Sequence, residues 1–305
     1  MVQPLVSIIL VNYNGYSDTV DCIRSLLNVD YDNFKIYVID NGSTVNATPE
    51  QLQYISQHSN YIWSDNNLGF SGGNNLGIDY AMKDNPDYYL LLNNDTEVEP
   101  DFLDKLVKVG SEKDDAGIIT GKILWFDDKL RVWYAGGEYN YETGKTTHFH
   151  YDEINNESDK KIEAVTFASG CLWLIPRQVI CNVGKMDERM FLYAEDTEYC
   201  CRVIKNGLKI YYTNDSVIYH KVSRSTGFGS TNSQYYNVRN TLFINNIYSS
   251  NRIRVLLRQI VIWEKEAFRG RMDFYAVQQG ILDFVKHKSG KRDRFRRKLK
   301  CKCSQ

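Results

Sequence analysis

The stretch LLLNND at residues 90–95 is the first place where this sequence could do chemistry, because three leucines run directly into two amides and a carboxylate. Three large apolar residues in a row predict a strand buried on both faces. Asn93, Asn94 and Asp95 are ordinary turn formers, so a polar turn that closes the strand is the simpler interpretation. The alternative is functional, since a carboxylate at the C-terminal edge of a parallel sheet faces a ligand crevice.

A second acidic group lies in FLYAEDTEYCCR at residues 191–202. Glu195, Asp196 and Glu198 fall within one helical turn, where acids suit the positive end of the helix dipole. A solvated helix start would explain them without any function. The apolar residues just before them favour a different interpretation, in which a partly buried carboxylate has a raised pKa and acts as a base.

The third group is VIYHKVSRSTG at residues 217–227. His220 follows a strand of alternating character, so it is either a half-buried structural histidine or a ligand. Lys221 and Arg224 are cations that could meet phosphate oxygens. Whether the three groups act together depends on the elements that carry them.

The first hundred residues alternate strand and helix patterns, which predicts an α/β fold with a parallel sheet and right-handed crossovers. In such a sheet all strand ends lie along one edge, the usual place for a ligand, and here each end carries polar residues. The expected strands cover residues 6–14, 34–43, a short run before 65, and 88–95; the expected helices cover 17–28, 48–58 and a segment from about Asn74.

The stretch NNLGFSGGNN at residues 66–75 predicts a loop of unusual backbone freedom. Gly69, Gly72 and Gly73 permit left-handed dihedrals and close backbone approach. A helix from about Asn74 would offer free N–H groups to a phosphate. The sequence contains neither GxGxxG nor GxxxxGK[ST], which disfavours dinucleotide and P-loop sites, and a purely structural loop stays open.

The composition is that of an ordinary globular protein, with 305 residues, 43% hydrophobic and 25% charged. It predicts one large domain or one domain with an appendage. The sequence has no run of about 18 uncharged apolar residues, and the N-terminus resembles a first strand rather than a signal peptide. Seven cysteines without a CxxC pair predict reduced thiols in a cytosolic protein.

The charge is unevenly distributed. Residues 286–302 contain ten Lys and Arg against one acid, which leaves 27 basic and 37 acidic residues in 1–285. Residues 251–285 alternate apolar and basic residues at helical spacing, so they form either a packed appendage or an interfacial helix beside anionic lipid. Nucleic acid is the less favoured polyanion, because the rest of the chain is acidic.

Taken in order, these stretches resemble the family 2 glycosyltransferases with the GT-A fold, most closely their rhamnosyltransferase-like bacterial members. The resemblance covers about residues 5–245, and its specificity comes from the ordered set of VSIILVNYN, DNGS, NLGFSGGNNLGI, LLLNNDTEVEPDFL, FLYAEDTEYCCR, HKVSRSTG and YYNVRN. It implies a Rossmann-like, mostly parallel sheet flanked by helices in 1–245, with a nucleotide-binding half at 1–100 and an acceptor-binding half at 101–245. A helical, basic C-terminal region would follow at 246–305.

The resemblance also implies residue roles. Asp196 would be the base that deprotonates the acceptor hydroxyl, and Glu195 would orient acceptor groups. Asp40 would hydrogen-bond the pyrimidine of the donor. Lys221 and Arg224 would meet the diphosphate. The whole set expected at the nucleotide is Asn12, Asn14, Asp40, Asn67, Gly69, Gly72, Asn74 and Asn94.

The implied cofactor is a divalent cation, Mg²⁺ or Mn²⁺, bound by Asp95 and His220. The sequence departs here from the DxD motif of the family, because Asn93 stands where the first acid would be. A cation at this site would depend on the histidine and on the donor's own phosphate oxygens.

The implied activity is an inverting, metal-dependent transfer of a hexosyl group from a UDP- or dTDP-linked sugar, with rhamnose among the candidates. The acceptor would be a glycan or polyprenyl-diphosphate-linked hydroxyl in bacterial cell-surface polysaccharide synthesis. The protein would be cytoplasmic and peripheral on the inner membrane face, attached through its basic tail. A sugar nucleotidylyltransferase and a nucleotide-sugar-binding module without catalysis are the alternatives.

Overall fold

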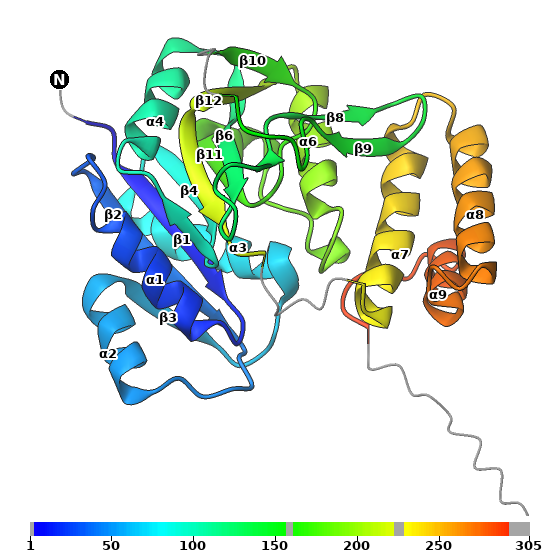
Figure 1. Cartoon of the computed structure of the whole chain (residues 1–305), viewed down its shortest axis with the longest axis horizontal. Helices are drawn as coiled ribbons and strands as arrows, with labels where there is room; N and C mark the ends of the chain where they lie inside the picture. Colours follow the sequence, from blue (N-terminus) through cyan, green and yellow to red (C-terminus); the bar gives the residue numbers. More distant parts are fainter. Residues whose placement is uncertain (1–2, 157–160, 223–228, 293–305) are drawn as a thin grey trace, which may run out of the picture.

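The apolar runs predicted as buried strands form the middle of one large sheet in the computed structural model, which describes residues 3–156, 161–222 and 229–292. The α/β class and the parallel order predicted for the first hundred residues are confirmed (Figure 1). The four strands of this half lie in the order β4-β1-β2-β3, and they are β1 (Val6–Asn12), β2 (Phe34–Asn41), β3 (Asn60–Ser64) and β4 (Tyr88–Asn93).

The second half of the chain extends the sheet to β10-β12-β6-β11-β4-β1-β2-β3, with β11 antiparallel to both β6 and β4. Because β11 runs opposite to β4, the residues just before β11 lie beside the end of β4. The Asn93 N–H donates to the Cys171 carbonyl at 3.0 Å. The strands of this half are β5 (Thr96–Val98), β6 (Ala116–Trp125), β7 (Val132–Tyr134), β10 (Ile162–Val165), β11 (Leu172–Pro176) and β12 (Lys209–His220), with β8 (Gly137–Asn140) and β9 (Lys145–His148) as a separate hairpin.

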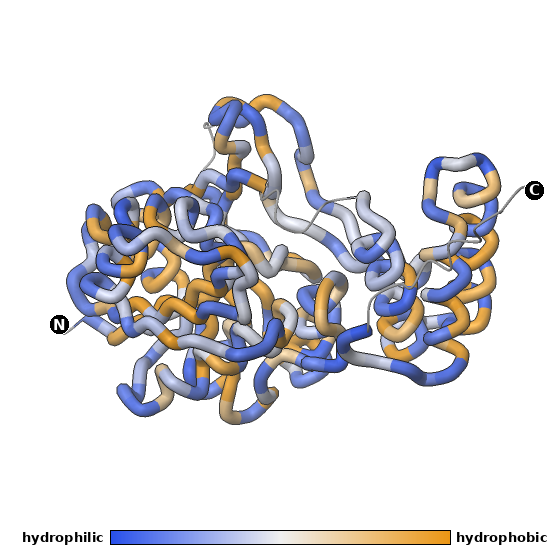
Figure 2. The backbone as a smooth tube through the Cα atoms, turned by 90° about the horizontal axis from the view of Figure 1, so that it is seen from below, coloured by the Kyte–Doolittle hydropathy of each residue, from blue (hydrophilic) through white to orange (hydrophobic). Residues whose placement is uncertain are grey.

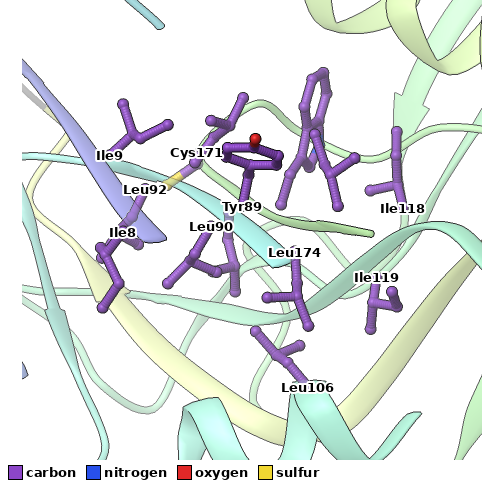
Figure 3. Close-up of a cluster of buried hydrophobic side chains, with 14 of the residues drawn as sticks. Ile8, Ile9, Tyr89, Leu90, Leu92, Leu106, Ile118, Ile119, Cys171 and Leu174 are labelled. Carbon is purple, nitrogen blue, oxygen red and sulfur yellow. The ribbon is translucent and has the colours of Figure 1, made fainter. Parts of the chain in front are cut away.

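The core of the sheet consists of fully buried aliphatic side chains from neighbouring strands. Figure 3 shows Ile8 and Ile9 of β1 beside Leu90 and Leu92 of β4 and Leu174 of β11. These side chains are at most 3% exposed. Burial on both faces is the reason that these strands read as continuous apolar runs rather than as alternating patterns.

Helices pack against the sheet through the crossovers that the parallel order requires. Strand β12 is interrupted by a register shift between Thr213 and Val217, as at a β-bulge. The helices of the sheet domain are α1 (Tyr16–Leu26), α2 (Pro49–His58), α3 (Gly69–Ala81), α4 (Phe102–Glu112), α5 (Arg177–Val183) and α6 (Glu195–Lys205), with short 3-10 turns η1 (Met82–Asp84) and η2 (Glu188–Met190).

The prediction that a helix begins at about Asn74 is wrong, because α3 begins at Gly69 and includes Gly72 and Gly73. Glycine and asparagine have low helix propensity, and here packing overrides that propensity. A Cβ atom on Gly73 would lie 2.7 Å from Val11 Cγ1, so this glycine lets the helix lie directly on the sheet.

Three further helices form an appendage beside the sheet domain (Figure 1). They are α7 (Thr231–Tyr248), α8 (Arg252–Phe268) and α9 (Phe274–Val285), and they share a small core that includes Val238, Leu242 and Val277. The predicted boundary at residue 245 falls inside α7, and the division into domains stays a prediction. Figure 2 shows apolar and polar segments alternating along these helices. Within the described ranges, no helix is long and apolar enough to cross a membrane.

Candidate active site

The polar ends of β1, β2 and β4 lie together, as the parallel order predicted. Asn12 is the register partner of Asp40 on β2, and its Nδ2 donates to Asp40 Oδ2 at 3.2 Å. Asn94 Nδ2 lies 3.4 Å from Asn12 Oδ1 and 2.8 Å from Thr19 Oγ1. The sheet edge therefore carries a connected layer of amides and one carboxylate.

Asp40 is fully buried, and both of its oxygens are already hydrogen-bonded. Oδ2 accepts from the hydroxyls of Tyr16 at 2.5 Å and Tyr61 at 3.1 Å, in addition to Asn12. Oδ1 accepts from the Ser43 N–H at 3.0 Å. Burial raises the pKa of both tyrosines, and the Asp40 carboxylate raises them further, so both hydroxyls stay protonated as donors. Because Asp40 is fully buried, a pyrimidine could contact it only if the surrounding side chains moved.

Asn14 joins the turns that follow β1 and β2. Its backbone is left-handed, with φ of 62°, and its Oδ1 accepts from the Thr44 and Val45 N–H groups at 2.7 and 3.0 Å. Its own N–H donates to Ser43 Oγ at 2.9 Å. Asn14 thus holds the two turns at the carboxyl edge of the sheet in place, and the residue type alone does not indicate this role.

The glycine-rich segment contacts the loop before α6. Gly69 has φ of +76°, and a Cβ there would lie 2.1 Å from the Phe191 carbonyl oxygen. The Phe70 N–H donates to that same oxygen at 2.8 Å, and the Gly69 N–H donates to Asn67 Oδ1 at 2.8 Å. Asn74 Nδ2 donates to the Phe70 carbonyl at 3.0 Å. Two N–H groups at this helix start are therefore already bonded within the protein.

Asp95 and His220 converge on one point, although 125 positions separate them. His220 ends β12, which pairs antiparallel with β5 directly after Asp95, and His220 lies opposite Thr96. His220 Nε2 lies 3.2 Å from Asp95 Oδ1 and 3.5 Å from Asn93 Nδ2. Both side chains are almost completely buried, and the Trp133 ring meets the imidazole edge-on at 4.6 Å between centroids.

This donor set fits a divalent cation only in part. Burial lowers the pKa of His220, but Cys171 and the Asp95 carboxylate beside it outweigh burial and raise it. One carboxylate oxygen and one imidazole nitrogen leave most positions around a cation to other ligands. In the parts of the chain that the structure describes, no cluster of three or more His, Cys, Asp or Glu side chains is arranged to hold a metal. Asp95 and His220 would hold a cation together with phosphate oxygens.

Lys221 forms ion pairs with three carboxylates of the sheet domain. Its ammonium lies 2.9 Å from Asp21, 3.3 Å from Glu97 and 3.7 Å from Asp18. These three carboxylates already neutralise it, which argues against the predicted contact with the diphosphate. Arg224 lies outside the described residues.

The acid pair Glu195 and Asp196 begins α6, and its two members have different surroundings. Asp196 Oδ1 accepts from the Thr197 N–H at 2.7 Å, whereas Glu195 is 7% exposed and its Oε2 has no hydrogen-bond partner in the described chain. Burial, and then the charge of Asp196, raise the pKa of Glu195 to about 8. Burial also raises the pKa of Asp196, but the N–H groups of Thr197 and Gly170 oppose that rise. Asp196 therefore ionises first, and Glu195 keeps its proton at neutral pH.

Residues 169–171 connect this acid pair to the end of β4. A Cβ on Gly170 would lie 3.5 Å from Asp196 Cβ and 3.2 Å from Phe70 Cε1. The neighbouring Cys171 carbonyl accepts the Asn93 N–H. The antiparallel entry of β11 thereby brings the start of α6, the start of α3 and the end of β4 to one edge of the sheet.

Sequence reasoning missed several residues that shape the site. Tyr16 and Tyr61 hold Asp40, and Asn240 of α7 binds the loop before α6. Asn75 binds the Met186 backbone through both its amide oxygen and its nitrogen. Asn75 belongs to the Gly/Asn stretch, but nothing in the local sequence indicates that its partner lies 111 positions away.

A mostly parallel sheet with a polar carboxyl edge, in which the antiparallel strand β11 and the parallel strand β12 help to bring an acid pair and a histidine to that edge, defines a glycosyltransferase of the GT-A fold. A solved structure of GalNAc-T7 with UDP, GalNAc and Mn²⁺ shares this fold at a TM-score of 0.65 and 15% identity, over 94% of this chain and 58% of that chain. The family model for glycosyl transferase family 2 matches residues 7–183, more than half of the sequence. The chain belongs to that family.

Curated relatives cover most of the sequence. The chain is 27% identical over 302 residues to the low-salt glycan biosynthesis hexosyltransferase Agl10 of Haloferax volcanii, covering 94% of this chain and 93% of that protein. It is 26% identical over 221 residues to the rhamnosyltransferase WbbL of Escherichia coli, covering 68% of this chain and 80% of that protein. The expected family and fold are thus confirmed, and rhamnosyltransferases are among the relatives.

Proposed function

We propose that this chain is an inverting glycosyltransferase that moves a hexosyl group from a UDP- or dTDP-linked donor to a hydroxyl of a glycan or polyprenyl-diphosphate-linked acceptor. One observation carries the proposal: an ionisable acid at the start of α6 lies at the same sheet edge as the Asp95–His220 pair. A base for the acceptor and a charge site for the diphosphate are the two groups that a single displacement requires.

In the proposed reaction the Asp196 carboxylate accepts the proton of the acceptor hydroxyl. The acceptor oxygen attacks the anomeric carbon from the face opposite the diphosphate, and the bond from that carbon to the diphosphate oxygen breaks with inversion. A divalent cation bound by Asp95 and His220 would supply positive charge beside the leaving diphosphate. Glu195, which holds its own proton, donates a hydrogen bond to an acceptor oxygen or to the backbone.

The donor is proposed from the relatives and from a solved structure of the same fold. The similarity to WbbL supports a deoxyhexose such as rhamnose. The bound nucleotide in the GalNAc-T7 structure supports a nucleoside diphosphate leaving group. The family match favours transfer over the nucleotidylyltransferase alternative.

Asp196→Asn separates an enzyme from a binding module. We expect the wild-type protein with Mn²⁺ to hydrolyse or transfer one member of a panel of UDP- and dTDP-sugars, and the variant to lose turnover while it still binds that donor. At 100 times the dissociation constant the donor should stabilise both proteins by about 2.7 kcal/mol, measured as a thermal shift. Equal turnover by the two proteins would exclude Asp196 as the base, and binding without turnover by either would favour the binding module.

We also propose that the C-terminal region attaches the protein to an anionic membrane surface. The outer face of α8 carries a row of exposed apolar residues beside a row of cations, an arrangement typical of an interfacial helix. The apolar row is Ile253, Leu257, Val261 and Phe268, each at least half exposed, and the cations are Arg254, Arg258, Lys265 and Arg269. The basic residues that follow Arg292 in the sequence add to the positive charge.

Co-sedimentation with vesicles containing phosphatidylglycerol tests this attachment. Leu257→Glu on α8 should reduce binding, whereas Leu130→Glu at a 71% exposed position of the sheet domain should not. A truncation should remove residues 293–305 rather than 286–305, because Lys291 hydrogen-bonds to the Asn67 backbone and Arg292 to the Tyr236 hydroxyl of α7. Equal binding by all variants would refute the assignment of α8 and the tail to the membrane.

A further inference from the structure

The turn between η2 and α6 has an unfavourable backbone. Phe191 has φ 61° and ψ −57°, Tyr193 has φ 65°, and Ala194 has φ 67° and ψ 0°. Three non-glycine residues out of four thus occupy sparsely populated left-handed conformations, which persist only when surrounding groups hold them. This turn leads directly into Glu195 and Asp196, so whatever holds it also sets the position of the acid pair.

One side chain from the appendage holds the turn. Asn240 of α7 is fully buried, and its Nδ2 lies within hydrogen-bond distance of three carbonyl oxygens of the turn. The acceptors are the Met190 oxygen at 2.7 Å, the Leu192 oxygen at 3.0 Å and the Tyr193 oxygen at 2.9 Å. The Met190 carbonyl also accepts the Leu192 N–H at 2.7 Å, so the contacts that depend most on Asn240 are those to the Leu192 and Tyr193 carbonyls.

The neighbouring Arg239 determines which way that amide faces. Its Nε donates to Asn240 Oδ1 at 2.9 Å, so the amide oxygen points to the guanidinium and the amide nitrogen points to the turn. The rest of the buried guanidinium binds the Tyr235 hydroxyl at 3.2 Å and backbone carbonyls, with Nη1 2.9 Å from the Gly290 oxygen and Nη2 3.4 Å from the Met190 oxygen. The clamp formed by Arg239 and Asn240 is therefore rigid on both sides.

The opposite side of the turn contacts the glycine-rich helix start. The Phe191 carbonyl accepts the Phe70 N–H at 2.8 Å and lies where a Cβ on Gly69 would be. A single turn thus touches α7 on one side and α3 on the other, and it ends at the acid pair. A change in its shape would move the acid pair and the helix start together.

We propose that Asn240 is a positioning residue for the transfer reaction. Its amide holds the turn of residues 190–194 in the conformation that sets Asp196 at the sheet edge and fixes the start of α3. The inference rests on the proposed function for the role of Asp196. Arg239 and Asn240 both lie on α7, so the helical appendage would contribute to the position of the active-site residues.

Asn240→Asp tests the proposal, because it keeps the size of the side chain and replaces the N–H donors with an oxygen that faces three carbonyl oxygens. Asn237→Asp is the matched control, an exposed asparagine on the same helix. We expect hydrogen exchange of peptides covering 67–75 and 189–198 to accelerate in Asn240→Asp alone, although residue 240 does not bond to the first of these segments. We expect kcat to fall about 10- to 100-fold, and binding of UDP or dTDP with Mn²⁺ to weaken by a smaller factor, because the start of α3 loosens together with the turn.

The outcomes separate the clamp from general stability. Unchanged exchange in both peptides, or exchange that rises equally throughout the chain, would overturn the proposal, and so would local exchange without a loss of kcat. If the aspartate variant does not fold, Asn240→Ala removes the donors without adding charge and is measured in the same way. If the wild-type protein turns over no donor, the proposed function fails, whereas the exchange result still decides whether Asn240 holds the turn.

Discussion

Glu195→Gln is expected to make the protein more stable at neutral and alkaline pH. Burial and the Asp196 charge raise the pKa of Glu195 to about 8, against 4.5 for the free side chain. The folded protein then keeps a proton that the unfolded chain has lost, so the free energy of unfolding falls as the pH rises from about 4.5 to about 8. Glutamine has the shape of the protonated acid and cannot ionise, so the variant does not show this loss.

The magnitude follows from the pKa difference. While the pH lies between the two pKa values, each pH unit lowers the free energy of unfolding by about 1.4 kcal/mol. The two units from pH 5 to pH 7 therefore remove about 3 kcal/mol of stability. We expect the two proteins to be of similar stability at pH 5 and the glutamine variant to be more stable by about 3 kcal/mol at pH 7. Other titrating groups contribute equally to both proteins and cancel in the difference.

Urea unfolding at pH 5, 6, 7 and 8 measures this difference directly. The free energies of the two proteins should diverge as the pH rises and stop diverging near pH 8. Parallel curves, separated by less than about 0.5 kcal/mol across the range, would refute the assignment of a retained proton to Glu195. The same variant should keep most of its turnover at pH 7, because Asp196 remains as the base.

Three further outcomes are expected. Asp95→Ala should abolish transfer, whereas Asn93→Ala should cost much less; comparable losses in a metal-dependent assay would mean that the roles are wrongly divided. Gly69→Ala should lower the free energy of unfolding by about 2 kcal/mol or more and weaken donor binding, because φ is +76° and the added Cβ meets a carbonyl oxygen at 2.1 Å; a thermal melt within 1 °C of wild type would contradict this. Tyr61→Phe removes one of four hydrogen bonds to the buried aspartate of β2 and should cost about 1–3 kcal/mol in urea unfolding.

The fold was predictable from the sequence because its main signals are local. Apolar runs such as 90–92 specify buried strands, and helices between them require parallel pairing. The ends of those strands then have to share an edge, which is why Asp95 and Asp40 could be named as site residues. The pairing of Asp95 with His220 was implied by the family resemblance, and the structure places the two side chains 3.2 Å apart.

The roles of the side chains could not be predicted, because they depend on partners that are distant in the sequence. The sequence correctly places Asp40 at the end of a strand. Only the tertiary packing shows that the hydroxyls of Tyr16 and Tyr61 donate hydrogen bonds to its carboxylate. The sequence around Lys221 likewise does not indicate that α1 supplies carboxylates to its ammonium.

The sequence by itself determined the alternation of strands and helices, the parallel pairing of the first half and the acids at the carboxyl edge, since hydrophobic pattern and turn chemistry act over a few residues. Only the tertiary structure decided where α3 begins, because helix–sheet packing overrides the low propensity of its glycines and asparagines. It also decided the shape of the turn before Asp196. That turn is unfavourable in isolation, and the side chain that holds it, Asn240, follows it by about fifty positions.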